Sequence, residues 1–308
     1  MMKKRLILGF FIFSLMFIVG ACGQNEDDHQ PDANAGQSDA GETVIYESEL
    51  GPVEIPANPQ RIVALSYAPN VLALGGNLVG VDEWTYGNPL FTERVKDIEI
   101  VSDQSLESIV AQQPDLIIAG SHTENLEEIQ KIAPTVVYTW GKLDYLQQQL
   151  EIGKLLNKEE EAEAWIQEFK QRTAELSRKI KEKHGDITVT VFETDAKNFY
   201  VFGNNWARGT EILYQAMELG MPEKVKEDAL ETGYYTLSLE VLPEYAGDFI
   251  VLSTGLGDNA FMESEIWKSI PAVKNGRVIE METKKSTYSD PITLEYLTDV
   301  FEEGFLNR

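Results

Sequence analysis

The sequence predicts an α/β protein of two lobes joined by one long helix. Short apolar runs alternate with segments of helical period, first at residues 61–65, 78–81, 116–119 and 135–138. The same alternation resumes after a long helical segment, at residues 187–193, 198–202, 248–253 and 277–281, and ends in a helix expected over 291–305. Such alternation is typical of a largely parallel sheet covered by helices. At 308 residues the chain has enough apolar material for two such lobes.

The long helical segment covers residues 158–183. Neither Gly nor Pro interrupts it, and its apolar face recurs every three or four residues, at Ala162, Ile166, Phe169, Thr173, Leu176 and Ile180. At 1.5 Å per residue it would span about 39 Å. So long a helix with one narrow apolar stripe suits a strut between lobes. We therefore expect an N-terminal lobe at 44–157, a connecting helix at 158–184 and a C-terminal lobe at 185–308.

The N-terminal residues are predicted to form an export signal. Three basic residues precede an apolar run over residues 6–19, which is too short to span a membrane and right for a signal peptide over 1–21. The run closes on Val19-Gly20-Ala21-Cys22, which looks like the lipobox of bacterial lipoproteins, whose cysteine is diacylated. Cys22 is the only cysteine, so a disulfide framework and thiol catalysis are excluded. Residues 22–43 are mostly polar and are expected to form a flexible tether.

The charge of the chain restricts its partners. Cleavage before Cys22 would remove three basic residues and no acidic ones, which takes the formal net charge from −25 to −28. So acidic a protein is a poor binder of nucleic acid and of anionic lipid surfaces. We expect an extracytoplasmic protein that touches the membrane only through its lipid.

The most distinctive stretch runs over residues 198–209. An aromatic strand pattern leads into the turn Gly203-Asn204-Asn205, and Thr210 is a suitable N-cap for a helix over 210–219. The stretch presents two aromatic rings, Tyr200 and Trp206, beside the permanent cation of Arg208, and such a combination makes a recognition surface. Secondary candidates fall just after other predicted strands, where loop side chains reach a cleft: Tyr67, Trp84 and His122.

A short internal repeat supports two related lobes. Ser105-Leu106-Glu107 precedes residues 114–118, and Ser238-Leu239-Glu240 precedes residues 247–251. In each copy the aspartate that opens the next strand lies eight positions after the glutamate. The repeat places Glu107 and Glu240 at equivalent edges of the two lobes, where paired outward acids would suit docking on a basic partner.

These motifs together resemble the iron-siderophore-binding lipoproteins of ABC importers in Gram-positive bacteria, and among them the ferric hydroxamate binders. The resemblance covers the whole chain, and its most specific part is the Asn-Trp-x-Arg-Gly turn at residues 205–209. It also covers the lipobox, the repeat, the strut helix, and residues 245–248, 266–268 and 288–291. The chain departs from the family at Lys285-Ser286-Thr287, where relatives often carry further aromatic residues.

The resemblance implies two Rossmann-like lobes on one helix, the class III substrate-binding fold, acting as a monomer without enzyme activity or cofactor. It implies that a ferric siderophore sits in the cleft between the lobes. The ligand contacts would then be Tyr200, Trp206, Arg208 and Tyr288. The glutamates that dock on permease arginines would be Glu107 and Glu240.

The ligand chemistry agrees with this resemblance. A trishydroxamate already fills the six oxygen positions around Fe(III), so the protein would supply no metal ligands. Arg208 can donate hydrogen bonds to hydroxamate oxygens. A triscatecholate carries three negative charges and would call for a cluster of cations, so a hydroxamate is favoured. Catecholate, haem and cobalamin remain alternatives, although direct metal or haem ligation has only three histidines to use, at positions 29, 122 and 184.

Two enzyme classes are weaker alternatives. Residues 255–260 fit a Gly-x-Gly-x-x-Ala dinucleotide fingerprint, with Glu280 twenty residues beyond, but no helical period follows at once. A hydrolase is disfavoured because the chain lacks a Gly-x-Ser-x-Gly elbow and the expected lobes contain only His122 and His184.

Overall fold

The computed structural model describes residues 41–195, 198–255 and 259–307. The expected signal peptide, Cys22, His29 and nearly all of the expected tether lie outside the described residues, as does the centre of the fingerprint at 255–260. None of the helices within the described ranges combines the length and the hydropathy of a membrane span.

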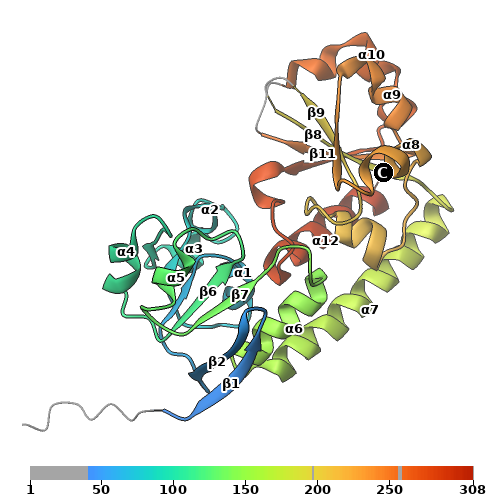
Figure 1. Ribbon diagram of the computed structural model, residues 1–308. Coiled ribbons are helices and arrows are strands. Elements are labelled where there is room, and N and C mark those ends of the chain that lie inside the picture. The colour runs from blue at the N-terminus through green and yellow to red at the C-terminus, as the bar shows by residue number, and fades with distance from the viewer. Residues whose placement is uncertain (1–40, 196–197, 256–258, 308) are drawn as a thin grey trace, which may run out of the picture. The chain divides into compact units, whose positions relative to one another are not determined.

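The N-terminal half contains a parallel five-stranded sheet, of which Figure 1 labels β6 and β7. Its strand order is β5-β4-β3-β6-β7. Its strands are β3 (Ile62–Ala64), β4 (Leu78–Val81), β5 (Glu99–Ile100), β6 (Leu116–Gly120) and β7 (Thr135–Tyr138). Short helices connect them: α1 (Ala68–Ala73), α2 (Glu83–Tyr86), α3 (Thr92–Val95), α4 (Leu106–Ala111) and α5 (Leu126–Ile129). β6 and β7 are buried throughout, as expected for strands covered on both faces. A hairpin that the sequence patterns did not predict precedes the sheet, formed by β1 (Thr43–Ser48) and β2 (Gly51–Pro56).

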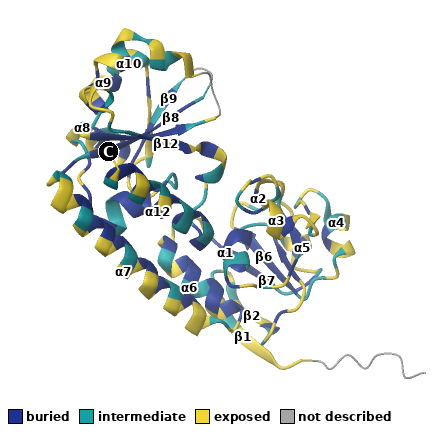
Figure 2. Ribbon diagram, turned by 180° about the vertical axis from the view of Figure 1, so that it is seen from behind, coloured by how far each residue is buried: buried dark blue, intermediate teal, exposed yellow. Residues whose placement is uncertain are grey.

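Two helices follow this sheet, α6 (Tyr145–Leu155) and the long α7 (Glu159–His184). The predicted apolar stripe of α7 is buried along its whole length, and Figure 2 shows buried and exposed residues alternating along the helix. α7 packs on α6 and on α12 (Pro291–Leu306). Arg172 on α7 pairs with Glu295 and Asp299 on α12, and the Trp165 indole N–H donates to Glu295 at 3.2 Å. The strut is therefore fastened to the C-terminal half by charge as well as by its apolar face.

The C-terminal half forms a mixed sheet in the order β10-β9-β8-β11-β12. Its strands are β8 (Val189–Thr194), β9 (Phe199–Phe202), β10 (Tyr234–Leu237), β11 (Phe249–Thr254) and β12 (Val278–Glu282). β8, β11 and β12 are parallel, whereas β9 is antiparallel to both β8 and β10. The expectation of a largely parallel arrangement therefore holds for this half except at β9, which alone runs against the other four strands. Only residues 195–198 separate β8 from β9, which is too few for the crossover that a parallel pair needs.

Short helical elements connect these strands. They are the π-helix η1 (Glu211–Ala216), α8 (Glu223–Ala229), η2 (Leu239–Val241), α9 (Leu242–Tyr245), η3 (Asn259–Glu263), α10 (Glu265–Ser269), α11 (Pro271–Lys274) and η4 (Thr283–Lys285). The helix expected over 210–219 is thus a shorter π-helix. Thr210 is not its side-chain N-cap, because its backbone is already helical.

The two sheets repeat one strand order, so that β3, β4, β5, β6 and β7 correspond to β8, β9, β10, β11 and β12. In each sheet an aspartate at the equivalent position accepts backbone hydrogen bonds from the residues just before the neighbouring strand. Asp115 before β6 accepts the backbone N–H groups of Gln60 at 2.7 Å and Arg61 at 2.9 Å, just before β3. Asp248 before β11 accepts the backbone N–H of Thr188 at 2.8 Å, just before β8. The predicted class, an α/β fold of two lobes with one long helix, is confirmed.

Candidate ligand-binding site

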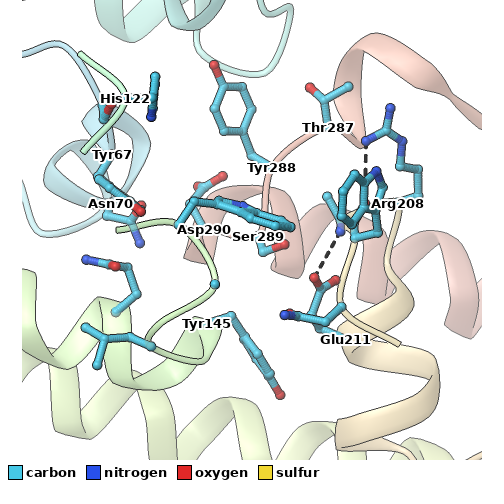
Figure 3. A pocket seen from close by; sticks show the side chains of 18 residues that line it. Tyr67, Asn70, His122, Tyr145, Arg208, Glu211, Thr287, Tyr288, Ser289 and Asp290 are labelled. Carbon is cyan, nitrogen blue, oxygen red and sulfur yellow. Dashed lines mark hydrogen bonds between the residues drawn. The ribbon is translucent and has the colours of Figure 1, made fainter. Parts of the chain in front are cut away.

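A pocket of about 420 Å³ lies where loops of the two sheets meet α6 (Figure 3). The N-terminal sheet and α6 contribute Ser66, Tyr67, Asn70, His122, Trp140, Gly141, Leu143, Tyr145 and Gln148. The C-terminal half contributes residues 205–208, Glu211 and residues 287–290. The pocket therefore gathers five of the predicted site residues, namely Tyr67, His122, Trp206, Arg208 and Tyr288. Tyr200 and Trp84 do not line it.

The turn after β9 has an unusual backbone. Ala207, Arg208 and Gly209 are consecutive residues in the left-handed region, with φ of 55°, 54° and 75°. For non-glycine residues this conformation costs about 1–2 kcal/mol each, so the surroundings must enforce it. Three hydrogen bonds do so: Arg208 N–H to the Ser286 carbonyl at 2.7 Å, Ala207 N–H to Glu211 at 2.9 Å, and Trp206 N–H to the Thr210 hydroxyl at 3.0 Å.

Two glycines allow this turn to pack closely. A Cβ on Gly209 would lie 2.4 Å from Cζ of Phe301, so this position needs glycine both for its backbone and for the close approach of α12. A Cβ on Gly233 would lie 2.2 Å from the Trp206 ring, which therefore rests directly on that glycine. The turn is a fixed platform built from the C-terminal half.

Arg208 is not a free cation. Its Nε and Nη2 donate to the two carboxylate oxygens of Glu193, each at 3.0 Å, and Ser253 donates to the same carboxylate at 2.7 Å. Glu193 lies near the end of β8 and is 6% exposed. Because β9 is antiparallel to β8, the turn after β9 begins on the side of the sheet where β8 starts. Arg208 nevertheless reaches back to Glu193 and Ser253, near the carboxyl ends of β8 and β11. The sequence patterns did not identify Glu193, because its partner is fifteen positions away on another element.

Aromatic rings extend from the pocket onto β10. Trp140, which follows β7, meets Trp206 edge to face at 4.9 Å between ring centroids. Trp206 contacts Tyr234 at 5.1 Å, and Tyr234 contacts Tyr200 at 6.2 Å. Two rings therefore lie between Tyr200 and Trp140. The Tyr200 hydroxyl donates a hydrogen bond to Asp195 at 2.7 Å. Trp140 could have been predicted, because it follows a predicted strand just as Tyr67 and His122 do.

Tyr288 links the two halves at the edge of the pocket. Its ring meets Phe91 edge to face at 5.7 Å, and its hydroxyl lies 3.4 Å from the Thr85 hydroxyl. Both contacts come from the N-terminal half. Burial raises the pKa of the Tyr288 phenol well above its ordinary value, so it stays a neutral donor.

Two carboxyl groups line the pocket and are buried. Glu211 is 2% exposed and Asp290 is 1% exposed, and burial raises the pKa of each. Asp290 caps α12 by accepting the backbone N–H of Ile292 at 2.9 Å. Lys284 and Lys285 are close to Tyr288 in the sequence, but neither of them lines the pocket. The lining is thus aromatic and polar without an excess of positive charge.

The remaining predicted residues lie apart from the turn. The His122 ring packs directly over Gly120, whose Cβ would lie 2.4 Å from it. Trp84 is 85% exposed on α2. Glu107 and Glu240 are exposed in the first turns of α4 and η2. Among the described residues, no three His, Cys, Asp or Glu side chains cluster as metal ligands would.

Comparison with known proteins matches residues 62–284 to the family described as periplasmic binding protein. The chain is 36% identical over 301 residues to the iron(3+)-hydroxamate-binding protein FhuD of Bacillus subtilis, covering 95% of each chain. It is 31% identical to the iron(3+)-hydroxamate-binding protein YxeB of the same organism, covering 100% of this chain and 98% of the relative. The structure of FhuD2 from Staphylococcus aureus with bound ferrioxamine B superposes with a TM-score of 0.76 at 31% identity, covering 81% of this chain and 99% of that chain.

Proposed function

Since the chain belongs to the periplasmic binding protein family, whose members bind rather than transform their ligands, we propose that it captures a ferric hydroxamate siderophore and delivers it to an ABC permease. In this proposal the ligand occupies the pocket between the two sheets. The protein acts as a monomer and needs no cofactor, because the iron arrives as cargo inside the siderophore.

The observation that carries the proposal is the chemistry of the pocket lining. Trp206, Trp140 and Tyr67 offer aromatic faces, which bury an organic shell, and the single arginine on the lining is already paired with Glu193. A ferric trishydroxamate is uncharged at its centre and has all six iron positions filled, so it needs apolar faces and hydrogen bonds rather than metal ligands or a cluster of cations. Two relatives at more than 30% identity are named as iron(3+)-hydroxamate binders, which supports the same class.

In this proposal the ligand contacts are Trp206, Arg208 and Tyr288 from the C-terminal half, with Tyr67, His122 and Trp140 from the N-terminal half. Tyr200 supports Trp206 through Tyr234, and Trp84 serves as an outer contact. The lobes and linker correspond to residues 44–157, 158–184 and 185–308, after a signal peptide at 1–21 and a tether at 22–43. Diacylation of Cys22 would hold the protein on the outer side of the cell membrane.

A titration of the mature protein across ligand classes tests the ligand. Trp206 lies on the pocket, so ferrichrome or ferrioxamine B at micromolar concentration should quench the tryptophan fluorescence. A ferric triscatecholate, haem and cobalamin should leave it unchanged at the same concentration. Saturable quenching by one of these three, with none by either hydroxamate, would show that the ligand class is wrong.

A separate experiment tests delivery and anchoring. Glu107→Lys and Glu240→Lys should leave siderophore affinity unchanged and reduce uptake of labelled iron by cells, because both carboxylates are exposed and neither lines the pocket. Glu127→Lys, an equal charge reversal at another exposed helix start, is the control. Uptake equal to that of the control would contradict the docking role. Cys22→Ala should release the protein into the medium.

A further inference from the structure

Among the described residues, Arg208 is the only residue of the pocket lining that forms an ion pair, and its buried partner is Glu193. The pair is bidentate, and the exposed fractions of the two side chains are 19% and 7%. Ser253 donates to Glu193 at 2.7 Å, and the Ser253 hydroxyl lies 2.7 Å from that of Thr283. A carboxylate held at this depth by three donors keeps its orientation, and it fixes that of the guanidinium.

The pairing changes what Arg208 can offer to a ligand. A guanidinium has five N–H donors, and Glu193 takes one on Nε and one on Nη2. The donors on Nη1 and the second on Nη2 are left, with one weak contact from Nη1 to the Trp206 carbonyl at 3.4 Å. The unit formed by both residues has no net charge. Arg208 therefore presents hydrogen-bond donors without presenting a positive charge.

From this geometry we infer that Glu193 is a positioning residue that sets the charge of the ligand the pocket accepts. The inference rests on the proposed function and extends it. With Arg208 neutralised, the described lining presents no unpaired arginine or lysine, and its carboxyl groups are those of Glu211 and Asp290, so the pocket favours neutral or cationic ferric complexes over anionic ones. Replacing the Glu193 carboxylate by an amide would expose the charge of Arg208 and move this preference toward anions.

The test measures affinity of the mature wild type and Glu193→Gln for three ferric complexes of different charge. Ferrichrome is neutral, ferrioxamine B is cationic through its terminal ammonium, and a triscatecholate carries three negative charges. In Glu193→Gln we expect the ratio of ferrichrome affinity to triscatecholate affinity to fall about tenfold or more, because one unscreened charge acts over a few ångströms in a partly buried site. An unchanged ratio in the folded variant would overturn the inference.

The salt dependence of ligand binding distinguishes an effect of charge from an effect of structural damage in Glu193→Gln. Raising the salt from about 0.1 M to about 1 M shortens the Debye length from about 10 Å to about 3 Å, so triscatecholate binding by Glu193→Gln should weaken while ferrichrome binding holds. A purely structural role for Glu193 would weaken both complexes alike and give no new salt dependence.

A matched control removes the same charge nearby. Glu282→Gln acts at the end of β12, where Glu282 pairs with Lys285 at 2.8 Å, and neither residue lines the pocket. It should keep the wild-type ratio, and a shift equal to that of Glu193→Gln would contradict a local effect.

Two further results distinguish a failure of the inference from a folding failure and from a failure of the proposed function. If Glu193→Gln does not fold, Arg208→Gln tests the same inference with the opposite change of charge, because it leaves the Glu193 carboxylate without its cation. The ratio of ferrioxamine B affinity to ferrichrome affinity should then rise. An unchanged ratio would overturn the inference. If the wild type binds neither hydroxamate, the proposed function fails. If the wild type binds both and the charge variants keep its ratios, only the present inference fails.

Discussion

The two sheets share one strand order but supply the pocket in different ways. The C-terminal half supplies a turn whose three left-handed residues are held by Ser286, Glu211 and Thr210, with the arginine fixed by Glu193. The N-terminal half supplies the buried Asn70, Tyr145 and Gln148 from α1 and α6, and loop residues that are more exposed: Trp140 is 59% exposed, and His122 is exposed as well. One half thus provides a prebuilt platform, and the other provides side chains that cover it.

This difference teaches where the specificity of the pocket resides. A rigid group recognises shape and donor geometry because little entropy is lost when the ligand binds, whereas exposed side chains on loops adapt to the ligand. Changes to the platform should therefore reduce both stability and binding. Changes to the covering residues should reduce binding alone.

The largest expected effect comes from Gly209→Ala on the platform. The new Cβ meets the Phe301 ring at 2.4 Å and occupies a backbone with φ of 75°, so the free energy of unfolding should fall by about 3 kcal/mol. Gly141→Ala is the matched change in the N-terminal half, where φ is 79° but no atom lies within 4 Å of the Cβ, and it should cost about 1 kcal/mol. Chemical denaturation measures both, and equal losses would remove the distinction between the halves.

The next effect compares the two tryptophans that touch across the pocket. Trp206 packs on the C-terminal core, so Trp206→Ala should weaken siderophore binding by about 2 kcal/mol and also lower the melting temperature. Trp140→Ala removes a mostly exposed ring and should weaken binding by about 1 kcal/mol at unchanged melting temperature. Isothermal titration and thermal unfolding without ligand give the two quantities. A loss of stability in Trp140→Ala would show that this residue is structural.

The smallest effect concerns the acid that holds the turn. Burial raises the pKa of Glu211 in the folded state above the ordinary value of 4.5, so the folded state binds its proton more tightly than the unfolded state does. The stability that comes from this proton is present below pH 4.5 and is lost as the pH rises through the folded pKa. Relative to Glu211→Gln, the wild type should therefore lose unfolding free energy as the pH rises from 4.5. Urea denaturation of both proteins across this range measures the difference, and a difference constant with pH would contradict the buried-acid assignment.

Sequence patterns predicted the regular elements well. The strands β4 and β7 begin and end where the apolar runs do, and the long helix is displaced by one residue from its predicted bounds. These elements are predictable because the spacing of their apolar residues along the sequence shows which residues are buried. The hairpin β1–β2 and the strand β10 were missed, since both carry exposed apolar side chains and lack the pattern of a buried strand.

The site was predictable only where its residues are close in sequence. Trp206 and Arg208 share one turn, and that turn is distinctive. The partner of Arg208 is Glu193, and the ring beside Trp206 is Tyr234; both come from other strands, so only the strand order brings them together. Whether a residue lines the pocket also depends on rotamers and on neighbouring rings, which is why Tyr200 lies behind Tyr234.

The division of the core between the halves has a consequence for how the chain folds during synthesis. The apolar clusters around the N-terminal sheet draw on residues 46–162, whereas the core beneath α7 needs residues as late as Phe305. The first sheet can therefore bury its core while the rest of the chain is still being made. The pocket needs Trp206 and Tyr288 as well, so a truncated chain can hold a folded first lobe and still have no place for a ligand.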